Sequence, residues 1–353
     1  MRLTSLTSLR FFAAAGVFLH HFEFYGDTKS PFLILLKKIL FEGFVGVTFF
    51  YVLSGFIIAY SYEQHRLKGT YRTRDFLFNR FSRLYPVHFL TLLIAILAYI
   101  PFQYFNIINP SQLLANIFLF QSAYPDSQYY FNFNGVAWSV STEMFFYVAF
   151  VFLVTLNTKQ LSIIGASVLA LIIAHIVKTS QSTAFTGWLF YINPAFRIID
   201  FIVGMLLCRL FLSGKITIKG ASATSLEFMS LLVLLGFVTY GYSNVSMLWR
   251  YDIYYITPMA FIVFVFSYGN GMVSRFLSKK TLLLFGDASF SLYMIHQILI
   301  HIAFKFFPVN IDSGKSVLLF MLAVMIIGIA LSCVLYKLYE NPINTWLRKH
   351  RAG

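Results

Sequence analysis

The first long apolar segment of the chain contains an arginine and two adjacent histidines, residue types that can bind an anion and accept a proton. Arg10 and His21 are eleven residues apart. That spacing brings both to one face of a helix, about 16 Å apart, whereas His20 is rotated from His21 by about 100°. Because an imidazole titrates near neutral pH, His21 could act as a general base toward a hydroxyl group. The alternative is that Arg10 reaches one membrane surface while the histidines lie at the other.

A second candidate site is the pair Arg80 and Arg83, one helical turn apart in RDFLFNRFSRLYP. Guanidinium groups bind phosphate through two parallel hydrogen bonds, so the pair predicts a site for a phosphorylated donor that enters from the cytosol. Anchoring of a span on its positive side explains the same residues. In the preceding FVGVTFFYVLSGFIIAY, Ser54 and Gly55 indicate close helix packing, and Ser54 as a nucleophile would require an adjacent base.

A carboxylate stands near the start of another apolar segment, NGVAWSVSTEMFFYV. Glu143 has Ser139 one turn before it and Tyr147 one turn after it. An acidic residue is costly inside a membrane, so Glu143 is expected to orient a histidine, bind a sugar hydroxyl or pair with an arginine. Trp138 could stack on a sugar ring, and an interfacial aromatic belt explains it as well.

Two further polar pairs lie late in the chain. Arg197 and Asp200 are one turn apart in FRIIDFIVGM, and we interpret them as an internal ion pair. Ser289 and His296 share a face two turns apart in GDASFSLYMIHQ. His296 is therefore either a hydrogen-bonded core residue or part of a site.

The elements that must position these residues are membrane-spanning helices. Hydrophobic residues make up 59% of the 353 residues and charged residues only 11%, a balance that indicates a bilayer environment. A span needs about 20 largely apolar residues. We therefore predict an all-α fold, a polytopic transmembrane helical bundle with about ten spans, at residues 6–25, 39–62, 84–101, 136–156, 160–178, 190–212, 225–241, 252–268, 281–304 and 316–339.

The segment 111–121 is apolar but too short to cross, so we predict a short non-spanning helix there. Residues 1–345 are expected to form a single transmembrane domain, followed by a basic cytoplasmic tail at 346–353. The net charge of +14 comes from basic clusters beside the spans, which indicate that both termini are cytoplasmic and that no nucleic acid is bound. Cys208 and Cys333 lie in apolar stretches, so neither a disulfide nor a cysteine-bound metal is predicted.

Six motifs in this order resemble the acyltransferase 3 family of integral membrane acyltransferases, which includes bacterial enzymes that O-acetylate lipopolysaccharide O-antigen, peptidoglycan and other glycans. The resemblance covers nearly the whole chain and rests on LRFFAAAGVFLHH, GVTFFYVLSGFII, NRFSRLYP, AWSVSTEMFFY, FRIIDFIVGM and GDASFSLYMIH. It implies that His21 is the essential histidine, that Arg10 is its partner, and that Arg80 and Arg83 belong to the acyl-CoA region.

The chain departs from the family pattern at Met144, where a second acidic residue is frequent, so that Glu143 alone supplies a carboxylate there. Some members of the family append a soluble hydrolase-like domain that receives the acyl group. We find no such domain in this sequence, and the membrane domain is therefore expected to complete the transfer itself.

The resemblance implies an O-acyltransferase of a bacterial inner membrane that moves an acyl group, expected to be acetyl from cytosolic acetyl-CoA, to a hydroxyl of a cell-envelope glycan such as lipopolysaccharide O-antigen. Membrane lipids, acyl-CoA and a glycan or lipid-linked glycan are the expected partners, and no metal is expected. The assigned residues are His21, Arg10 and Glu143 for catalysis, Arg80, Arg83, Ser54 and Tyr85 for the donor, and Trp138, Ser139 and His296 for the acceptor.

Two other classes of protein account for charged groups inside a membrane. A transporter or flippase of a glycan or lipid-linked substrate would move its substrate without consuming acyl-CoA. A membrane sensor or scaffold would tolerate the loss of His21 and Glu143. The arginine pair beside a cytoplasmic mouth and the spacing of Arg10 and His21 favour the enzyme.

Overall fold

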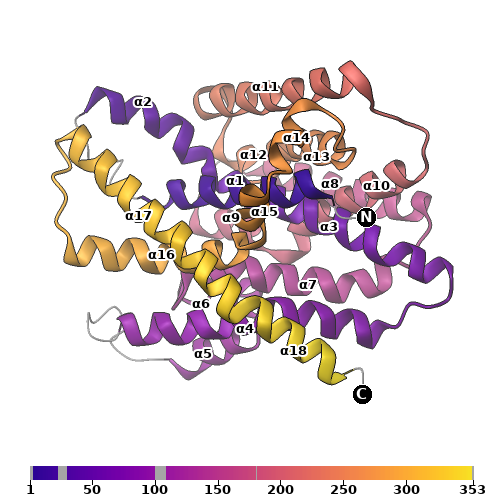
Figure 1. The fold of residues 1–353 in the computed structure, drawn as a ribbon, viewed down its shortest axis with the longest axis horizontal. Helices are drawn as coiled ribbons and strands as arrows, with labels where there is room; N and C mark the ends of the chain where they lie inside the picture. The colour runs from indigo at the N-terminus through magenta and orange to yellow at the C-terminus, as the bar shows by residue number, and fades with distance from the viewer. Residues whose placement is uncertain (1–2, 23–29, 100–108, 180, 352–353) are drawn as a thin grey trace.

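The computed structural model describes residues 3–22, 30–99, 109–179 and 181–351, and within them every regular element is a helix (Figure 1). The predicted all-α fold is therefore confirmed. The predicted ends of the first and third spans, at 23–25 and 100–101, and the last two residues of the predicted tail lie outside the described residues.

Each of the ten predicted spans overlaps a long helix, although the span predicted at 281–304 covers both α15 and α16, which are bent by 61°. These are α1 (Thr4–His20), α3 (Gly46–Leu67), α4 (Thr73–Tyr99), α7 (Trp138–Leu153), α8 (Thr158–Lys178), α10 (Pro194–Leu212), α11 (Gly220–Asn244), α13 (Ile253–Ser267), α16 (Ser289–Phe306) and α17 (Gly314–Leu335). The segment predicted not to cross forms the eight-residue α5 (Pro110–Ile117), which is too short for a bilayer.

Shorter helices connect or extend the long ones. They are α2 (Pro31–Leu40), η2 (Phe41–Val45), η4 (Gln121–Ala123), α6 (Ser127–Tyr130), η5 (Gly135–Ala137), α9 (Ala184–Gly187), η6 (Trp188–Ile192), α12 (Met247–Arg250), α14 (Met272–Leu277), α15 (Lys280–Asp287), η7 (Tyr336–Glu340) and α18 (Asn341–Arg351). Local signals fix several helix starts. Asn157 caps α8 through a reciprocal bond with Gln160, and Asn193 caps α10 ahead of a proline at the first helical position.

Six helical stretches in the described chain are long and apolar enough to cross a membrane, or seven if the bent pair α15 and α16 forms one span. The other predicted spans are α1 and α13, with 17 and 15 residues, and α10, which contains three charged residues, Arg197, Asp200 and Arg209. Helices surrounded by protein need less apolar surface than helices that face lipid. The number of ten crossings stays a prediction.

The bundle is built around the contact between α3 and α10, the most extensive between any two described helices. Small residues make this approach possible. A Cβ added at Gly55 would overlap the carbonyl oxygen of Phe201, and one added at Gly204 would overlap that of Val52. The backbones of α3 and α10 therefore touch, and the α3 residues on either side of Gly55 are fixed in position.

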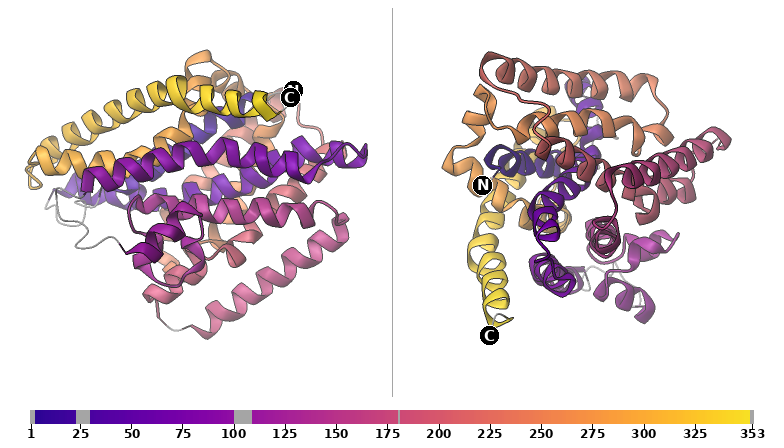
Figure 2. Two further views of the ribbon diagram at one scale, coloured as in Figure 1. Left: turned by 90° about the horizontal axis from the view of Figure 1, so that it is seen from below. Right: turned by 90° about the vertical axis from the view of Figure 1, so that its right-hand side faces the viewer.

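The bundle has two ends, and different segments of the chain gather at each. The start of α1, the turn between α3 and α4 and the end of α18 lie at one end, whereas α2, α5 and α6 lie at the other (Figure 1). Figure 2 shows that α17, η7 and α18 form one long rod that passes along α4. Residues 346–351 of the predicted tail thus belong to a helix that packs on the bundle, and the predicted domain boundary stays untested.

Replacing Gly55 by alanine is expected to lower the free energy of unfolding by about 1–3 kcal/mol, because the new methyl group meets backbone that cannot move aside. Thermal unfolding of the purified protein in detergent measures the change. Gly236→Ala in α11 is the matched control, since nothing lies within 4 Å of its added Cβ. Equal stability of the Gly55 variant and the parent would contradict the tight contact.

Candidate active site

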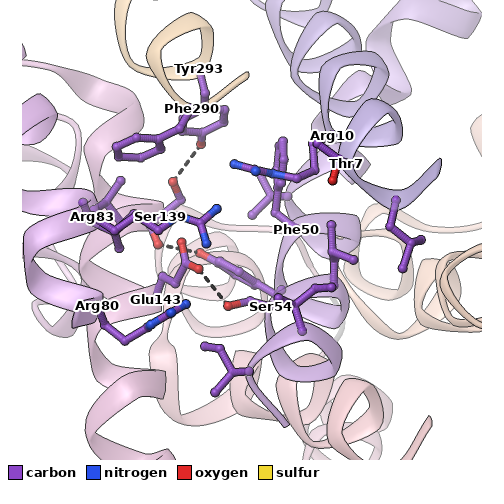
Figure 3. A pocket seen from close by; sticks show the side chains of 18 of the residues that line it. Thr7, Arg10, Phe50, Ser54, Arg80, Arg83, Ser139, Glu143, Phe290 and Tyr293 are labelled. Atoms are coloured by element: carbon purple, nitrogen blue, oxygen red, sulfur yellow. Dashed lines mark hydrogen bonds between the residues drawn. The ribbon is translucent and has the colours of Figure 1, made fainter. Parts of the chain in front are cut away.

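A cavity of about 330 Å³ lies between α1, α3, α4, α7 and α16 (Figure 3). We call it the arginine pocket. Its walls are mainly apolar, with a few convergent polar groups, as is usual for small-molecule sites. The predicted residues that it brings together are Arg10, Ser54, Arg80, Arg83, Ser139 and Glu143.

The guanidinium groups of Arg10 and Arg83 point into the pocket from opposite walls (Figure 3). Arg80 is only 9% exposed, stands over the ring of Tyr62 at 5.6 Å, and has a buried Nε without a hydrogen-bond partner. Among the described residues, no carboxylate lies within ion-pair distance of these three arginines. A pocket with three guanidinium groups and one carboxylate in its wall is suited to an anionic ligand.

Glu143 is held by hydroxyl groups from two helices. Its Oε1 accepts hydrogen bonds from Ser54 of α3 at 2.8 Å and from Tyr147 of α7 at 2.7 Å. The sequence left three partners open for this carboxylate, and the structure places it with hydroxyls on the wall of the arginine pocket. Ser54 therefore does have an adjacent base, which spacing alone did not reveal.

Tyr293 of α16 connects the arginine pocket with the histidines. Its side chain lines the pocket, and its hydroxyl accepts a hydrogen bond of 2.8 Å from Ser139. Its backbone carbonyl accepts a hydrogen bond of 2.6 Å from Nδ1 of His296. Tyr51 of α3 completes this wall by donating to the carbonyl oxygen of Ser139 at 3.1 Å.

His21 and His296, the histidine pair, lie next to each other and not in the wall of the arginine pocket. Nδ1 of His21 is 2.8 Å from the carbonyl oxygen of Val17 and 3.3 Å from Nε2 of His296. A carbonyl only accepts, so Nδ1 carries the proton in both rings, and Nε2 is the basic nitrogen of a neutral His21. His296 is fully buried beside His21, and its predicted contact with the acceptor stays a prediction.

Two further residues that were predicted to bind a substrate, Trp138 and Tyr85, lie outside the arginine pocket. Trp138 is buried with its ring 4.9 Å from that of Tyr191. Tyr85 stacks on the partly exposed Phe81 at 4.4 Å. Tyr85 is two residues after Arg83, so its side chain is rotated by about 200° from that of Arg83 around the axis of α4. The predicted contacts of Trp138 with the acceptor and of Tyr85 with the donor have no support in this geometry and stay predictions.

Arg197 forms the internal ion pair that its spacing predicts. The guanidinium lies 2.7 Å from Asp200 and 3.5 Å from Asp252 of the segment before α13, and both pair members on α10 are fully buried. It also donates to Thr48 of α3 at 3.0 Å and stands over the ring of Tyr51 at 5.0 Å. Arg197 therefore joins three segments and supports one wall of the pocket.

Two residues at the site were not predicted from the sequence. Tyr293 is one turn before His296 in the motif GDASFSLYMIHQ. Glu340 is buried in η7, accepts a hydrogen bond from Ser291 at 2.5 Å, and lies near enough to Arg10 and Arg83 for their charges to interact. The rule that an acidic residue within a long apolar helix marks a site could have found Glu340.

The fold and the site define a multi-pass membrane protein with a pocket lined by three arginines and a separate histidine pair. The chain belongs to the acyltransferase 3 family, whose acyltransferase-domain model matches residues 3–337. Membership shows that the protein is an acyl-transferring enzyme and decides against the transporter and the scaffold.

Several named relatives match most of the chain. The acyltransferase MdmB of Streptomyces mycarofaciens is 26% identical over 99% of this chain and 94% of its own length. The exopolysaccharide production protein ExoZ of Rhizobium meliloti is 26% identical over 88% and 91%. A putative O-acetyltransferase of Staphylococcus aureus is 25% identical over 98% of this chain but 57% of its own length. No solved structure matches the chain.

The described residues contain no group of three or more His, Cys, Asp and Glu side chains arranged to hold a metal ion.

Replacing Arg197 by methionine is expected to destabilise the protein by about 3–5 kcal/mol, because Asp200 and Asp252 would be left as uncompensated buried charges. Thermal unfolding in detergent and the yield of folded protein measure the loss. Adding Asp200→Asn and Asp252→Asn to the same variant should restore part of the lost stability. A single variant as stable as the parent would show that the pair does not hold the helices together.

Proposed function

We propose that this protein transfers an acetyl group from cytosolic acetyl-CoA to a hydroxyl of an extracytoplasmic glycan. The observation that carries the proposal is the arginine pocket, in which Arg10, Arg80 and Arg83 surround a cavity with no ion-paired carboxylate among the described residues. Such a pocket suits a ligand that combines phosphate groups with a long, less polar arm.

The donor enters from the end of the bundle where α3 turns into α4. That turn contains a cluster of basic residues, Arg66, Lys68, Arg72 and Arg74, and basic loops are typical of the cytoplasmic side. The start of α1 and the end of α18 lie at the same end (Figure 1). The protein is thus proposed to lie in a bacterial inner membrane with both termini in the cytoplasm.

His21 lies at the other end of α1 and is proposed to receive the acceptor hydroxyl. Its Nε2 takes the hydroxyl proton as the oxygen attacks the thioester carbonyl, and the thiolate of coenzyme A leaves. His296 and the Val17 carbonyl keep the proton of His21 on Nδ1, so that Nε2 stays basic. Tyr293, which belongs to both parts of the site, marks the place that the thioester must reach.

Arg10 and Glu143 act from the wall of the pocket. Arg10 stabilises the negative charge that develops on the thioester carbonyl oxygen. Glu143 holds the hydroxyls of Ser54 and Tyr147 in fixed orientation. Ser139, hydrogen-bonded to Tyr293, contributes to the same wall.

A cell-envelope polysaccharide is the proposed acceptor, with lipopolysaccharide O-antigen as one example. The relative from Rhizobium meliloti is named for exopolysaccharide production, and the relatives from Staphylococcus aureus are named as putative O-acetyltransferases. The first name supports a polysaccharide acceptor for this chain, and the second supports transfer of an acetyl group to oxygen.

Replacing His21 by alanine is expected to reduce glycan acetylation by a factor of about 10²–10⁴, since general-base catalysis contributes that much. Mass spectrometry of envelope polysaccharide, from cells with and without the protein, measures the loss of one acetyl group per modified sugar. His175→Ala is the matched control, because His175 lies on the exposed side of α8. Unchanged acetylation by the His21 variant at normal protein levels would rule out its role.

Replacing Arg83 by glutamine is expected to weaken acetyl-CoA binding about tenfold or more, because a charge-assisted hydrogen bond to phosphate is lost. Titration of acetyl-CoA into the purified protein in neutral detergent measures the affinity. The control is Arg74→Gln, which removes the same charge from an exposed position on α4. Equal affinities for the Arg83 variant and the parent would place the donor elsewhere.

A further inference from the structure

The last described helix, α18, is mostly exposed but packs against α4, the helix that carries Arg80 and Arg83. Continuous with α17 through η7, α18 packs along α4 (Figure 2). Asn344 accepts a hydrogen bond from Ser82 at 3.3 Å, and Tyr339 donates to the carbonyl oxygen of Pro86 at 3.2 Å. These contacts hold α18 against the turns of α4 that present Arg80 and Arg83.

Arg348 of α18 comes directly beside the arginine pair. Its guanidinium donates to the backbone carbonyl of Asn79, the residue before Arg80, at 3.4 Å. The amide of Asn79 in turn contacts the hydroxyl of Tyr62 at 3.5 Å, and Tyr62 is the ring beneath Arg80. The side chain of Arg348 is otherwise exposed, so its remaining donors can reach a ligand.

Three guanidinium groups in one place repel one another unless an anion lies among them. Arg348 is close enough to Arg80 and Arg83 for this repulsion to act. Neither Glu143 nor Glu340 lies within ion-pair distance of these arginines. Glu143 is hydrogen-bonded to Ser54 and Tyr147, and Glu340 is hydrogen-bonded to Ser291.

The side chain of Arg80 has an unused hydrogen-bond donor in the wall of the arginine pocket. It is more than nine-tenths buried and lines the pocket, yet its Nε has no hydrogen-bond acceptor among the described residues. A buried polar donor without an acceptor is costly, and a ligand oxygen would remove the cost.

The cavity of about 330 Å³ is lined by Arg80 and Arg83 but by no residue of α18. A ligand that met Arg348 as well would therefore extend out of the cavity past Arg80 and Arg83.

We propose that Arg348 completes a phosphate-binding site with Arg80 and Arg83, and that α18 thereby clamps the nucleotide end of the acyl donor at the cytoplasmic mouth. This inference rests on the proposed function, because it takes acyl-CoA as the donor. The site recognises phosphate groups, which an anionic lipid headgroup at the same surface would also offer.

The test compares acetyl-CoA binding by the full-length parent, Arg348→Gln and Lys349→Gln in neutral maltoside detergent. Lys349 is the next residue on α18 and is exposed, and replacing it by glutamine removes the same unit of charge. We expect the Arg348 variant to bind about tenfold more weakly and the Lys349 variant to bind within about twofold of the parent. For S-acetylpantetheine, which has the thioester but no phosphate, the parent and the Arg348 variant should bind alike.

Three results would overturn the proposal. The first is an Arg348 variant that binds acetyl-CoA as tightly as the parent, and the second is an equal loss in the Lys349 variant, which would reveal a general effect of surface charge. The third is a loss that appears only in nanodiscs containing phosphatidylglycerol, which would assign Arg348 to lipid. Thermal unfolding of each variant checks that α18 is still folded.

The same measurements separate this inference from the proposed function. If the parent binds acetyl-CoA and Arg83→Gln weakens binding while Arg348→Gln does not, only the role of α18 is wrong. If the parent binds no acetyl-CoA, the proposed donor itself is wrong, and the phosphate site of α18 is overturned with it.

Discussion

The buried ion pair of Arg197 is the interaction on which the rest of the structure depends. A bilayer offers no water to a guanidinium group, so a protein that buries one must surround it with acceptors. Here Asp200, Asp252 and Thr48 do so from three segments of the chain. Because the contact fixes α3 against α10, it also fixes Tyr51 and the neighbouring Ser54, which form part of the pocket wall.

The polar groups left over from this scaffold are divided between the two ends of α1. Arg10 lies in a pocket near one end, and His21 lies just past the other. Tyr293 bridges the two through its side chain and its backbone. The arginines and the histidine pair are thus held on separate surfaces that meet at one residue of α16.

Features that depend on one helix could be predicted from the sequence, and features that depend on how helices meet could not. Apolar length predicted the positions of the helices, and one-turn spacing placed Arg80 with Arg83 in one pocket and Arg197 with Asp200 in an ion pair. The contact between His21 and His296 joins residues 275 positions apart, and no local pattern encodes it. Helical geometry could have warned that Tyr85 faces away from Arg83, but it could not show which neighbour covers either face.

The π-helical turn η7 rotates the side chains of α18 around the helix axis relative to those of α17. A π-helical turn amounts to one extra residue inserted into an α-helix, so it shifts every later side chain by about 100° around the axis. Without it, the face of α18 that meets α4 would be turned aside, and Arg348 with it. The face of α17 that packs on α16 and the face of α18 that packs on α4 therefore need not follow one continuous stripe along the rod.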